Sequence, residues 1–352
     1  MAQTLLLFFL TSTFGLFAQT KALTTQAPFY QNFSSSSSQL TPQWKRGHHP
    51  SQTSTSLMTA GSYSNSAGRR DYLLYSPSKT ASSAGLIVVL HGCLQTGEQM
   101  ASGTGFNNLA EQYGLFVLYP KQTILANPGK CWNWFKPENL QRDQGELSIL
   151  SGMTREIMAK NQIPPEKVVV TGLSAGAAMS SNLLACYSDL FAGAAIHSGA
   201  EFKAATSQGE ALQALKSGSR RNVNQTGQEA YNCSPPRHQL LKVISIHGTE
   251  DSSVHLINSN RVIDQFLQVN DLIDDGRDNN SFAPTVQTRI VPPGPNGQYP
   301  LRVETYYHQG QPQLKKIWVE GMGHAWSGGP ARIPYMDPYG IDVSQEILQF
   351  FF

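Results

Sequence analysis

The sequence predicts an α/β fold in which a doubly wound, mostly parallel sheet carries helices on both faces. Two observations lead to this prediction. Short apolar runs of strand length alternate with longer helix-like stretches, as they do in chains of βαβ units. One of these runs, residues 168–170, leads directly into Gly172-Leu173-Ser174-Ala175-Gly176, a sequence typical of a sharp strand-to-helix turn.

The individual elements follow from apolar periodicity and flanking turn residues. Strands are expected at residues 72–75, 86–90, 115–119, 167–171, 194–196, 241–246 and 316–319. Helices are expected at residues 98–113, 145–160, 175–186 and 343–352, the last of which closes the fold. Residues 202–236 and 271–300 are rich in Gly, Pro, Asn and Gln and do not fit the alternation. We expect them to be insertions on the loop side of the sheet, where specificity usually resides.

The chain is expected to have three parts. Residues 1–22 are predicted to be a signal peptide, because the apolar stretch at 5–18 is too short to span a membrane and small residues follow it. Cleavage is expected after Ala18 or Ala22. Residues 23–57 form a Ser-rich, low-complexity leader, and residues 58–352 form the catalytic domain. No later apolar run is long enough for a membrane helix, so the mature chain is expected to be soluble and secreted, into the medium or the periplasm.

Charge and motif content exclude several classes of partner. Charged residues make up 14% of the chain, against roughly 25% in an average soluble protein. The 26 basic and 24 acidic side chains leave a net charge of +2, which indicates neither nucleic-acid binding nor electrostatic recruitment to a membrane. No CxxC or HExxH spacing is present, so neither a metal site nor a cofactor is predicted. The sequence gives no oligomeric state.

Ser174 is the predicted nucleophile. Glycines on both sides of the turn allow the backbone to bend and leave the serine exposed at its tip. The alternative is an ordinary helix-capping serine. A serine hydroxyl is a poor nucleophile until a base removes its proton, so the prediction depends on a histidine and an acid elsewhere in the chain.

Both partners follow later strands. Asp251 lies on the loop after the strand at 241–246, and His324 lies on the loop after the strand at 316–319. The order Ser174, Asp251, His324 is that of the α/β-hydrolase triad, so we predict the α/β-hydrolase fold. Glu250 is the alternative acid, although the shorter Asp251 is preferred.

The predicted oxyanion hole follows the strand at 86–90. This strand ends in His91-Gly92-Cys93, and the backbone N–H groups of Cys93 and Ala175 are the expected donors. His91 and His247 end strands and are expected to be buried, hydrogen-bonded structural residues. His255 is expected to be a loop residue.

Five motifs make a resemblance specific. They are HGCLQTGEQM from His91, CWNWF from Cys131, GLSAGAAMS from Gly172, HGTEDSSV from His247 and GMGHAWSGG from Gly321. Together they resemble the polyhydroxybutyrate depolymerase family of esterases, which is similar to feruloyl and acetylxylan esterases and has the α/β-hydrolase fold. The resemblance covers roughly residues 58–352. It implies Ser174 as nucleophile, Asp251 as acid, His324 as base and Cys93 as an oxyanion-hole residue.

Four cysteines in an exported chain suggest two disulfides, for which three pairings are possible. The resemblance places Cys93 and Cys131 on neighbouring loops beside the active site. It therefore favours a Cys93–Cys131 bridge and leaves Cys186 with Cys233. A catalytic-thiol role for Cys93 is the weaker alternative, since Ser174 already supplies a nucleophile.

Aromatic residues flank these catalytic segments, namely Trp132, Trp134, Phe135 and Trp326. They are expected either to line the substrate pocket, with the three tryptophans as the candidates, or to pack in the core.

The predicted protein is thus a secreted serine esterase that works through an acyl-serine intermediate. Its expected substrate is poly- or oligo(3-hydroxybutyrate), and the alternatives are a feruloyl or acetylxylan esterase and a non-catalytic binding protein on the same fold. An intact triad argues against the last. No extra binding module is expected after the predicted closing helix, 343–352. Since such a module concentrates an enzyme on an insoluble surface, we expect cleavage of soluble oligomers and weak action on crystalline polymer.

Overall fold

A mixed sheet organises the part of the chain that the computed structural model describes, which is residues 57–79, 84–235 and 239–352. The predicted signal peptide and nearly all of the predicted leader lie outside these residues. Within them, ten strands form the main sheet in the order β1-β2-β4-β3-β5-β6-β7-β10-β9-β8. The strands are β1 (Met58–Asn65), β2 (Gly68–Tyr75), β3 (Leu86–Leu90), β4 (Phe116–Lys121), β5 (Val168–Leu173), β6 (Gly193–His197), β7 (Lys242–Gly248), β8 (Thr285–Val291), β9 (Leu301–His308) and β10 (Gln311–Val319).

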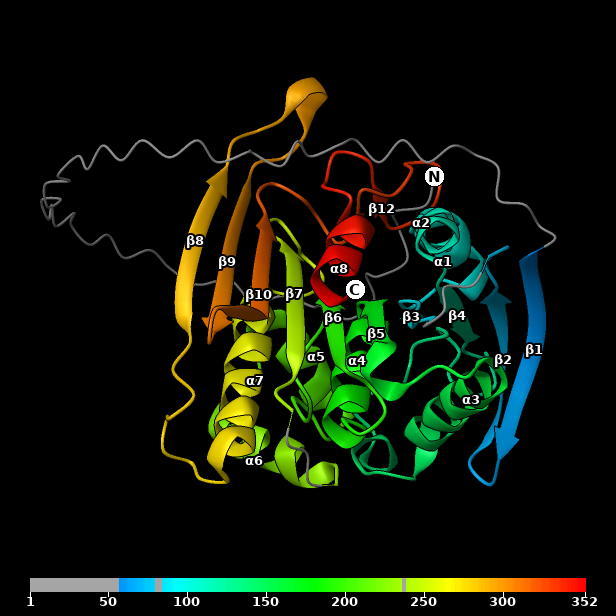
Figure 1. The fold of residues 1–352 in the computed structure, drawn as a ribbon, viewed down its shortest axis with the longest axis horizontal. Coiled ribbons are helices and arrows are strands. Elements are labelled where there is room, and N and C mark those ends of the chain that lie inside the picture. Colours follow the sequence, from blue (N-terminus) through cyan, green and yellow to red (C-terminus); the bar gives the residue numbers. More distant parts are fainter. Residues whose placement is uncertain (1–56, 80–83, 236–238) are drawn as a thin grey trace, which may run out of the picture. The chain divides into compact units, whose positions relative to one another are not determined.

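The centre of this sheet is parallel. The strands β4, β3, β5, β6, β7 and β10 pair in parallel, whereas antiparallel strands extend the sheet at both ends. Figure 1 shows the strands in this order, from β8 at one end to β1 at the other. The sheet confirms the predicted fold class.

Helices cover both faces of the parallel centre. They are α1 (Gly97–Gly103), α2 (Phe106–Tyr113), α3 (Gly145–Asn161), α4 (Ala175–Cys186), α5 (Gln208–Ser217), α6 (Val223–Cys233), α7 (Ile257–Asp275) and α8 (Val343–Phe351). Two short strands, β11 (Trp326–Ser327) and β12 (Met336–Asp337), pair separately. None of the helices that the structure describes is long and apolar enough to cross a membrane.

Strand β3 shows how the sheet separates two cores. Leu86, Val88 and Leu90 pack into one apolar cluster with residues of α3, α4 and α7, whereas Ile87 and Val89 pack into a second with residues of α1, α2 and α8. Alternate side chains of a strand point to opposite faces, so a continuous apolar run is needed when both faces are covered. Full burial of each such side chain contributes about 1.5–3 kcal/mol.

Two insertions differ from the sequence-based expectation. Residues 202–236 contain α5 and α6, which pack against α7, and α6 also packs against α4, so this insertion thickens a helical layer. Residues 271–300 contain the end of α7 and the edge strand β8. Both were expected to be insertions on the loop side of the sheet, and no helix or strand was predicted within them because few of their residues are apolar. In α6, for example, only Thr226, Gly227 and Ala230 are buried.

The predicted helix at 98–113 is two helices. Gly105 adopts a left-handed backbone conformation (φ 76°) that breaks the helical path and starts α2. Thr96 begins α1 with a capping box, in which its hydroxyl accepts from the Gln99 N–H while the Gln99 side chain accepts from the Thr96 N–H.

Candidate active site

Ser174 occupies a strained turn between β5 and α4. Its backbone lies at φ 58° and ψ −120°, a region that side-chain-bearing residues rarely adopt. Its hydroxyl makes no capping hydrogen bond to α4, which removes the helix-capping alternative. The flanking glycines are required by close backbone contacts, since a Cβ atom would lie 2.6 Å from the Leu90 carbonyl oxygen at Gly172 and 2.3 Å from it at Gly176.

The predicted acid and base meet at the carboxyl ends of β7 and β10. The Nδ1 atom of His324 lies 2.7 Å from Oδ2 of Asp251. The other carboxylate oxygen of Asp251 accepts from the backbone N–H groups of Ser253 (2.9 Å) and Val254 (2.8 Å). Burial opposes the charge of Asp251, but these hydrogen bonds and the facing imidazoles outweigh it and lower the pKa of this carboxyl below its usual value.

The alternative acid, Glu250, lies elsewhere. It is exposed, and its backbone N–H donates to the Met322 carbonyl oxygen at 3.0 Å. The structure therefore pairs His324 with Asp251.

His197, at the end of β6, joins the serine turn to the loop that carries His324. Its carbonyl oxygen accepts from the Ser174 N–H at 3.0 Å, and its ring Nε2 accepts from the Ser327 N–H at 3.2 Å. Burial lowers the pKa of His197 to about 3, so the ring is neutral at physiological pH. His197 was not among the residues predicted for the site, although β3, β6 and β7 each bring a histidine to the carboxyl edge of the sheet.

The histidines expected to be structural are placed as predicted. His91 and His247 are buried and hydrogen-bonded, and burial lowers the pKa of each. Nε2 of His247 lies 2.8 Å from the Val254 carbonyl oxygen and 3.5 Å from Oδ2 of Asp251. His255 is an exposed loop residue.

The candidate oxyanion loop lies beside the serine turn. A Cβ atom on Gly92 would lie 3.4 Å from that of Ser174, so the Gly92–Cys93 peptide is next to the candidate nucleophile. Ala175 is the first residue of α4, where backbone N–H groups have no intrahelical acceptor. Within the described ranges, neither the Cys93 nor the Ala175 amide donates a hydrogen bond, so both remain available for a ligand.

Both predicted disulfides are present. Cys93 is bonded to Cys131 and Cys186 to Cys233, and no cysteine is free. The bonded sulfur of Cys93 excludes the catalytic-thiol alternative in this state. In the described part of the chain, no group of three or more His, Cys, Asp or Glu residues could hold a metal ion.

Of the two expectations for the three tryptophans, the structure shows core packing rather than pocket lining. Trp132, Trp134 and Trp326 are at most 2% exposed and belong to the two apolar cores, so they do not line a substrate pocket in this structure. Trp326 stacks on His197 with ring centroids 5.2 Å apart and donates its indole N–H to Ser344 Oγ. Phe135 is partly buried and packs edge-on against Trp134.

The sheet order, the strained serine turn and the Asp–His pair define the class of α/β-hydrolases with a serine turn after the fifth strand. Within this class, the chain belongs to the esterase PHB depolymerase family, whose model matches residues 70–284.

Three relatives illustrate the family. The chain is 31% identical over 274 residues to poly(3-hydroxyalkanoate) depolymerase C of Paucimonas lemoignei, which covers 76% of this chain and 61% of the relative. It is 28% identical over 233 residues to feruloyl esterase B of Talaromyces stipitatus, covering 62% and 63%. The chain thus spans less than two thirds of the length of either relative. The acetyl xylan esterase structure from Aspergillus awamori superposes with a TM-score of 0.64 at 22% identity, covering 83% of this chain and 98% of that one.

Proposed function

We propose that the protein is a carboxylic ester hydrolase that works through an acyl-serine intermediate. The observation that carries the proposal is the 2.7 Å contact between His324 and Asp251. The loop of His324 is connected through His197 to the strained turn of Ser174. A carboxylate at Nδ1 fixes the tautomer that leaves Nε2 free to accept a proton, and it stabilises the imidazolium that forms.

The first half-reaction follows from these roles. His324 removes the proton of the Ser174 hydroxyl while the serine oxygen attacks the ester carbonyl. The resulting imidazolium then gives this proton to the departing alcohol, and an acyl-serine remains. In the second half-reaction His324 removes a proton from water as the water oxygen attacks the acyl carbonyl. The imidazolium then returns this proton to the Ser174 oxygen as the acyl–serine bond breaks, which regenerates the serine and releases the acid.

The negative oxygen of each tetrahedral intermediate needs donors that are already in place. We assign this role to the backbone N–H groups of Cys93 and Ala175. Neither donates to an acceptor among the described residues. Ala175 directly follows Ser174, and a Cβ atom on Gly92, the residue before Cys93, would lie 3.4 Å from that of Ser174. One such donor is worth about 10²–10³ in kcat.

Poly- or oligo(3-hydroxybutyrate) is the proposed natural substrate. The named activity of the Paucimonas lemoignei relative supports it. So does a group of exposed apolar side chains on the two loops that the Cys93–Cys131 bridge joins: Leu94 is 62% exposed, Ile124 59% and Leu125 93%. Exposed apolar groups of this kind mark contact surfaces and suit an aliphatic polyester.

Feruloyl or acetylxylan ester hydrolysis is the second candidate. It is supported by the named activity of the Talaromyces stipitatus relative. Export from the cytosol is part of both proposals, because two disulfides are typical of an oxidising compartment.

A substrate panel tests the proposal. Hydrolysis of p-nitrophenyl butyrate by the wild type, and its loss in Ser174→Ala, is the expected first result. The panel then compares 3-hydroxybutyrate oligomers, amorphous and crystalline polymer, and feruloyl and acetyl-xylan esters. We expect the oligomers to be cleaved fastest and crystalline film slowest. Activity confined to the plant cell-wall esters would move the assignment to the second candidate.

A paired variant sharpens the choice of substrate. Leu94→Ser with Leu125→Ser is expected to slow hydrolysis of amorphous polymer several-fold while leaving the rate on p-nitrophenyl acetate unchanged. An equal effect on both substrates would contradict a role of these side chains in polymer contact.

A further inference from the structure

His91 ends β3 and immediately precedes the peptide that carries the proposed oxyanion donor. Its side chain is fully buried and makes two hydrogen bonds. Nε2 lies 3.0 Å from the backbone nitrogen of Gln122, which can only donate, so Nε2 must accept. Nδ1 lies 2.8 Å from the Gly92 carbonyl oxygen, which can only accept, so Nδ1 must carry the proton. The two backbone partners therefore fix one neutral tautomer.

The Gly92 carbonyl and the Cys93 N–H belong to the same peptide unit. In a trans peptide these two groups point in opposite directions, so whatever holds the oxygen also sets the direction of the N–H. Two donors hold this oxygen, the His91 ring at 2.8 Å and the Gln95 N–H at 3.3 Å. Gln95 also accepts from the Gly92 N–H through its side chain (2.9 Å).

We propose that His91 is a positioning residue for the oxyanion hole, because its Nδ1–H holds the Gly92 carbonyl and so aims the Cys93 N–H at the reacting ester oxygen. The inference rests on the proposed function. Donation to the carbonyl also polarises the peptide, which makes its N–H a stronger donor when negative charge develops opposite it.

A buried polar network holds His91 in turn. The Gln122 side chain donates to the Cys131 carbonyl oxygen (3.0 Å) and to the Glu146 carboxylate (2.5 Å). Arg70 donates to the same carboxylate at 3.0 Å. These contacts connect the end of β4, the loop of the Cys93–Cys131 bridge and the start of α3 to the histidine.

The electrostatic surroundings keep the ring neutral. Burial, with a smaller contribution from Lys130, lowers the pKa of His91 to about 4, although the hydrogen bond to the Gly92 carbonyl and the charge of Glu98 oppose this shift. The neutral ring is the form that can accept from Gln122 and donate to Gly92 at the same time.

Two isosteric substitutions separate the two hydrogen bonds. The amide of His91→Asn reaches the position of Nδ1 and can still donate to the Gly92 carbonyl oxygen. The amide of His91→Gln reaches the position of Nε2 and can accept from Gln122, but it loses the bond to Gly92. Each variant keeps one of the two bonds, so their polar losses are matched.

Steady-state kinetics on p-nitrophenyl butyrate give the test. Deleting an oxyanion donor costs about 10²–10³ in kcat, so misaiming one in His91→Gln should cost about 10- to 100-fold with KM changed less than about twofold. His91→Asn should lose less than about fivefold by the same reasoning. The control is Asn270→Ala. Asn270 is fully buried on α7 and exchanges two hydrogen bonds with the Leu241 backbone (2.8 and 3.1 Å), so its loss should lower stability and leave kcat unchanged.

The outcomes separate clearly. Equal kcat losses in His91→Asn and His91→Gln would overturn the positioning role. So would a kcat loss in Asn270→Ala as large as that in His91→Gln at a similar fall in unfolding midpoint. Continued turnover by Ser174→Ala would instead overturn the proposed function.

A wild-type measurement covers the case in which a variant does not fold. Reaction with an alkyl p-nitrophenyl phosphonate places an oxyanion in the hole, and the ¹⁵N-resolved Nδ1–H resonance of His91 should then move downfield. An unmoved resonance would contradict the inference.

Discussion

The two disulfides close loops of similar size in different surroundings. The paired cysteines are 38 residues apart for Cys93–Cys131 and 47 apart for Cys186–Cys233. The chain-entropy model therefore gives about 4 kcal/mol of stabilisation for either bridge. Any difference in what the two bridges do must come from the groups around them.

Cys93–Cys131 joins two loops at the carboxyl edge of the sheet. The backbone around it is held by the Leu94 N–H, which donates to the Gly129 carbonyl oxygen at 2.8 Å, and by the bond from Gln122 to the Cys131 carbonyl. Its first cysteine supplies a proposed oxyanion donor.

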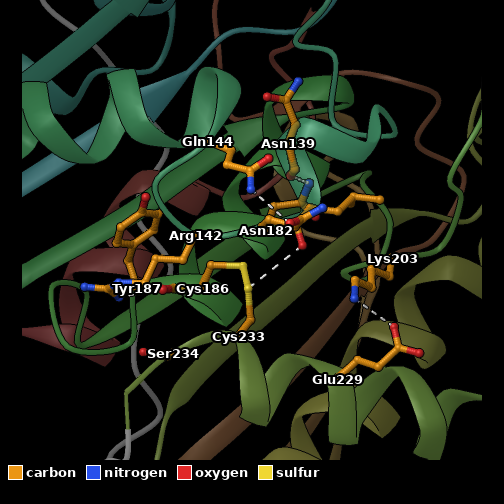
Figure 2. The surroundings of a disulfide bond; sticks show 12 residues. Asn139, Arg142, Gln144, Asn182, Cys186, Tyr187, Lys203, Glu229, Cys233 and Ser234 are labelled. Carbon is orange, nitrogen blue, oxygen red and sulfur yellow. Dashed lines mark hydrogen bonds and ion pairs between the residues drawn. A yellow bond between two sulfur atoms is a disulfide. The ribbon is translucent and has the colours of Figure 1, made fainter. Parts of the chain in front are cut away.

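Cys186–Cys233 joins the ends of α4 and α6 (Figure 2). Permanent charges surround it: Arg142 donates to the Cys186 carbonyl oxygen and forms a two-point pair with Asp189 (2.7 Å), and Lys203 lies 3.0 Å from Glu229. No proposed catalytic group takes part. We therefore expect the first cross-link to position reacting groups, and the second, of similar chain entropy, only to hold two helices together.

Loss of the nucleophile or of the base is expected to have the largest effect on activity, and it gives the scale against which the two bridges are compared. Ser174→Ala or His324→Ala should each lower kcat by about 10⁴- to 10⁶-fold, because either loss disables the same step. The double variant should be no worse than the single ones. Steady-state rates on p-nitrophenyl butyrate give the measurement. A single variant that kept more than about a tenth of the activity would exclude the mechanism.

Removing the first bridge should affect catalysis most. Cys93→Ser with Cys131→Ser is expected to lower kcat about 10- to 100-fold, because the Cys93 N–H loses its fixed direction. Mild reduction of the wild type should likewise lower activity before circular dichroism reports unfolding. Full activity in the doubly substituted protein would contradict the proposed role of this bridge in fixing the direction of the Cys93 N–H.

Removing the second bridge should affect stability alone. Cys186→Ser with Cys233→Ser is expected to lower the free energy of unfolding by about 4 kcal/mol, while kcat at 25 °C stays within about twofold of the wild type. Urea denaturation and initial rates measure the two quantities. A large fall in kcat in a folded protein would show that the helical layer also positions the site.

Lowering the pH is expected to produce a smaller difference between the two regions, in the free energy of unfolding. Burial lowers the pKa of His91 to about 4 and of His197 to about 3, both at the catalytic edge. The unfolded chain binds these protons near pH 6.5, so stability is fully present above that value and is lost as pH falls toward 4. At about 1.4 kcal/mol per pKa unit, His91 alone accounts for about 3 kcal/mol.

Urea unfolding between pH 4 and 7.5 measures how steeply the free energy of unfolding falls as the pH is lowered. In His91→Gln, the number of protons taken up on unfolding should be smaller by one. The bridge variant at Cys186 and Cys233 should leave it unchanged. A slope that is the same with and without His91 would contradict the assignment of this proton.

The features that could be predicted from the sequence are those that depend on short stretches of the chain and on backbone geometry. Strands buried on both faces need continuous apolar runs, so β3, β5 and β7 were identified close to their observed bounds. The glycines around Ser174 reflect backbone contacts that no other residue fits. The positions of Asp251 and His324 followed from strand order, and the structure brings these two side chains together.

The elements that were not predicted depend on contacts between segments that are far apart in the sequence. Helix α7 is absent from the predicted elements because its buried face includes Asn258, Gln265 and Asn270, whose hydrogen-bond partners lie on other segments. Strand β8 is exposed on nearly every residue, so it has no apolar alternation. The sequence left open whether the tryptophans near the site line a pocket or pack in the core, because proximity in sequence does not tell a lining side chain from one buried behind it.

Gly176 has a consequence for how this protein can change over evolutionary time. A Cβ atom at this position would lie 2.3 Å from the Leu90 carbonyl oxygen and 2.6 Å from that of His91, so the backbone at the start of α4 packs directly against the backbone at the end of β3. The spacing between the serine turn and the oxyanion loop is therefore set without any intervening side chain. Substitutions that alter side-chain size elsewhere in the two cores can accumulate without moving these two segments apart, whereas a single methyl group at position 176 would separate them.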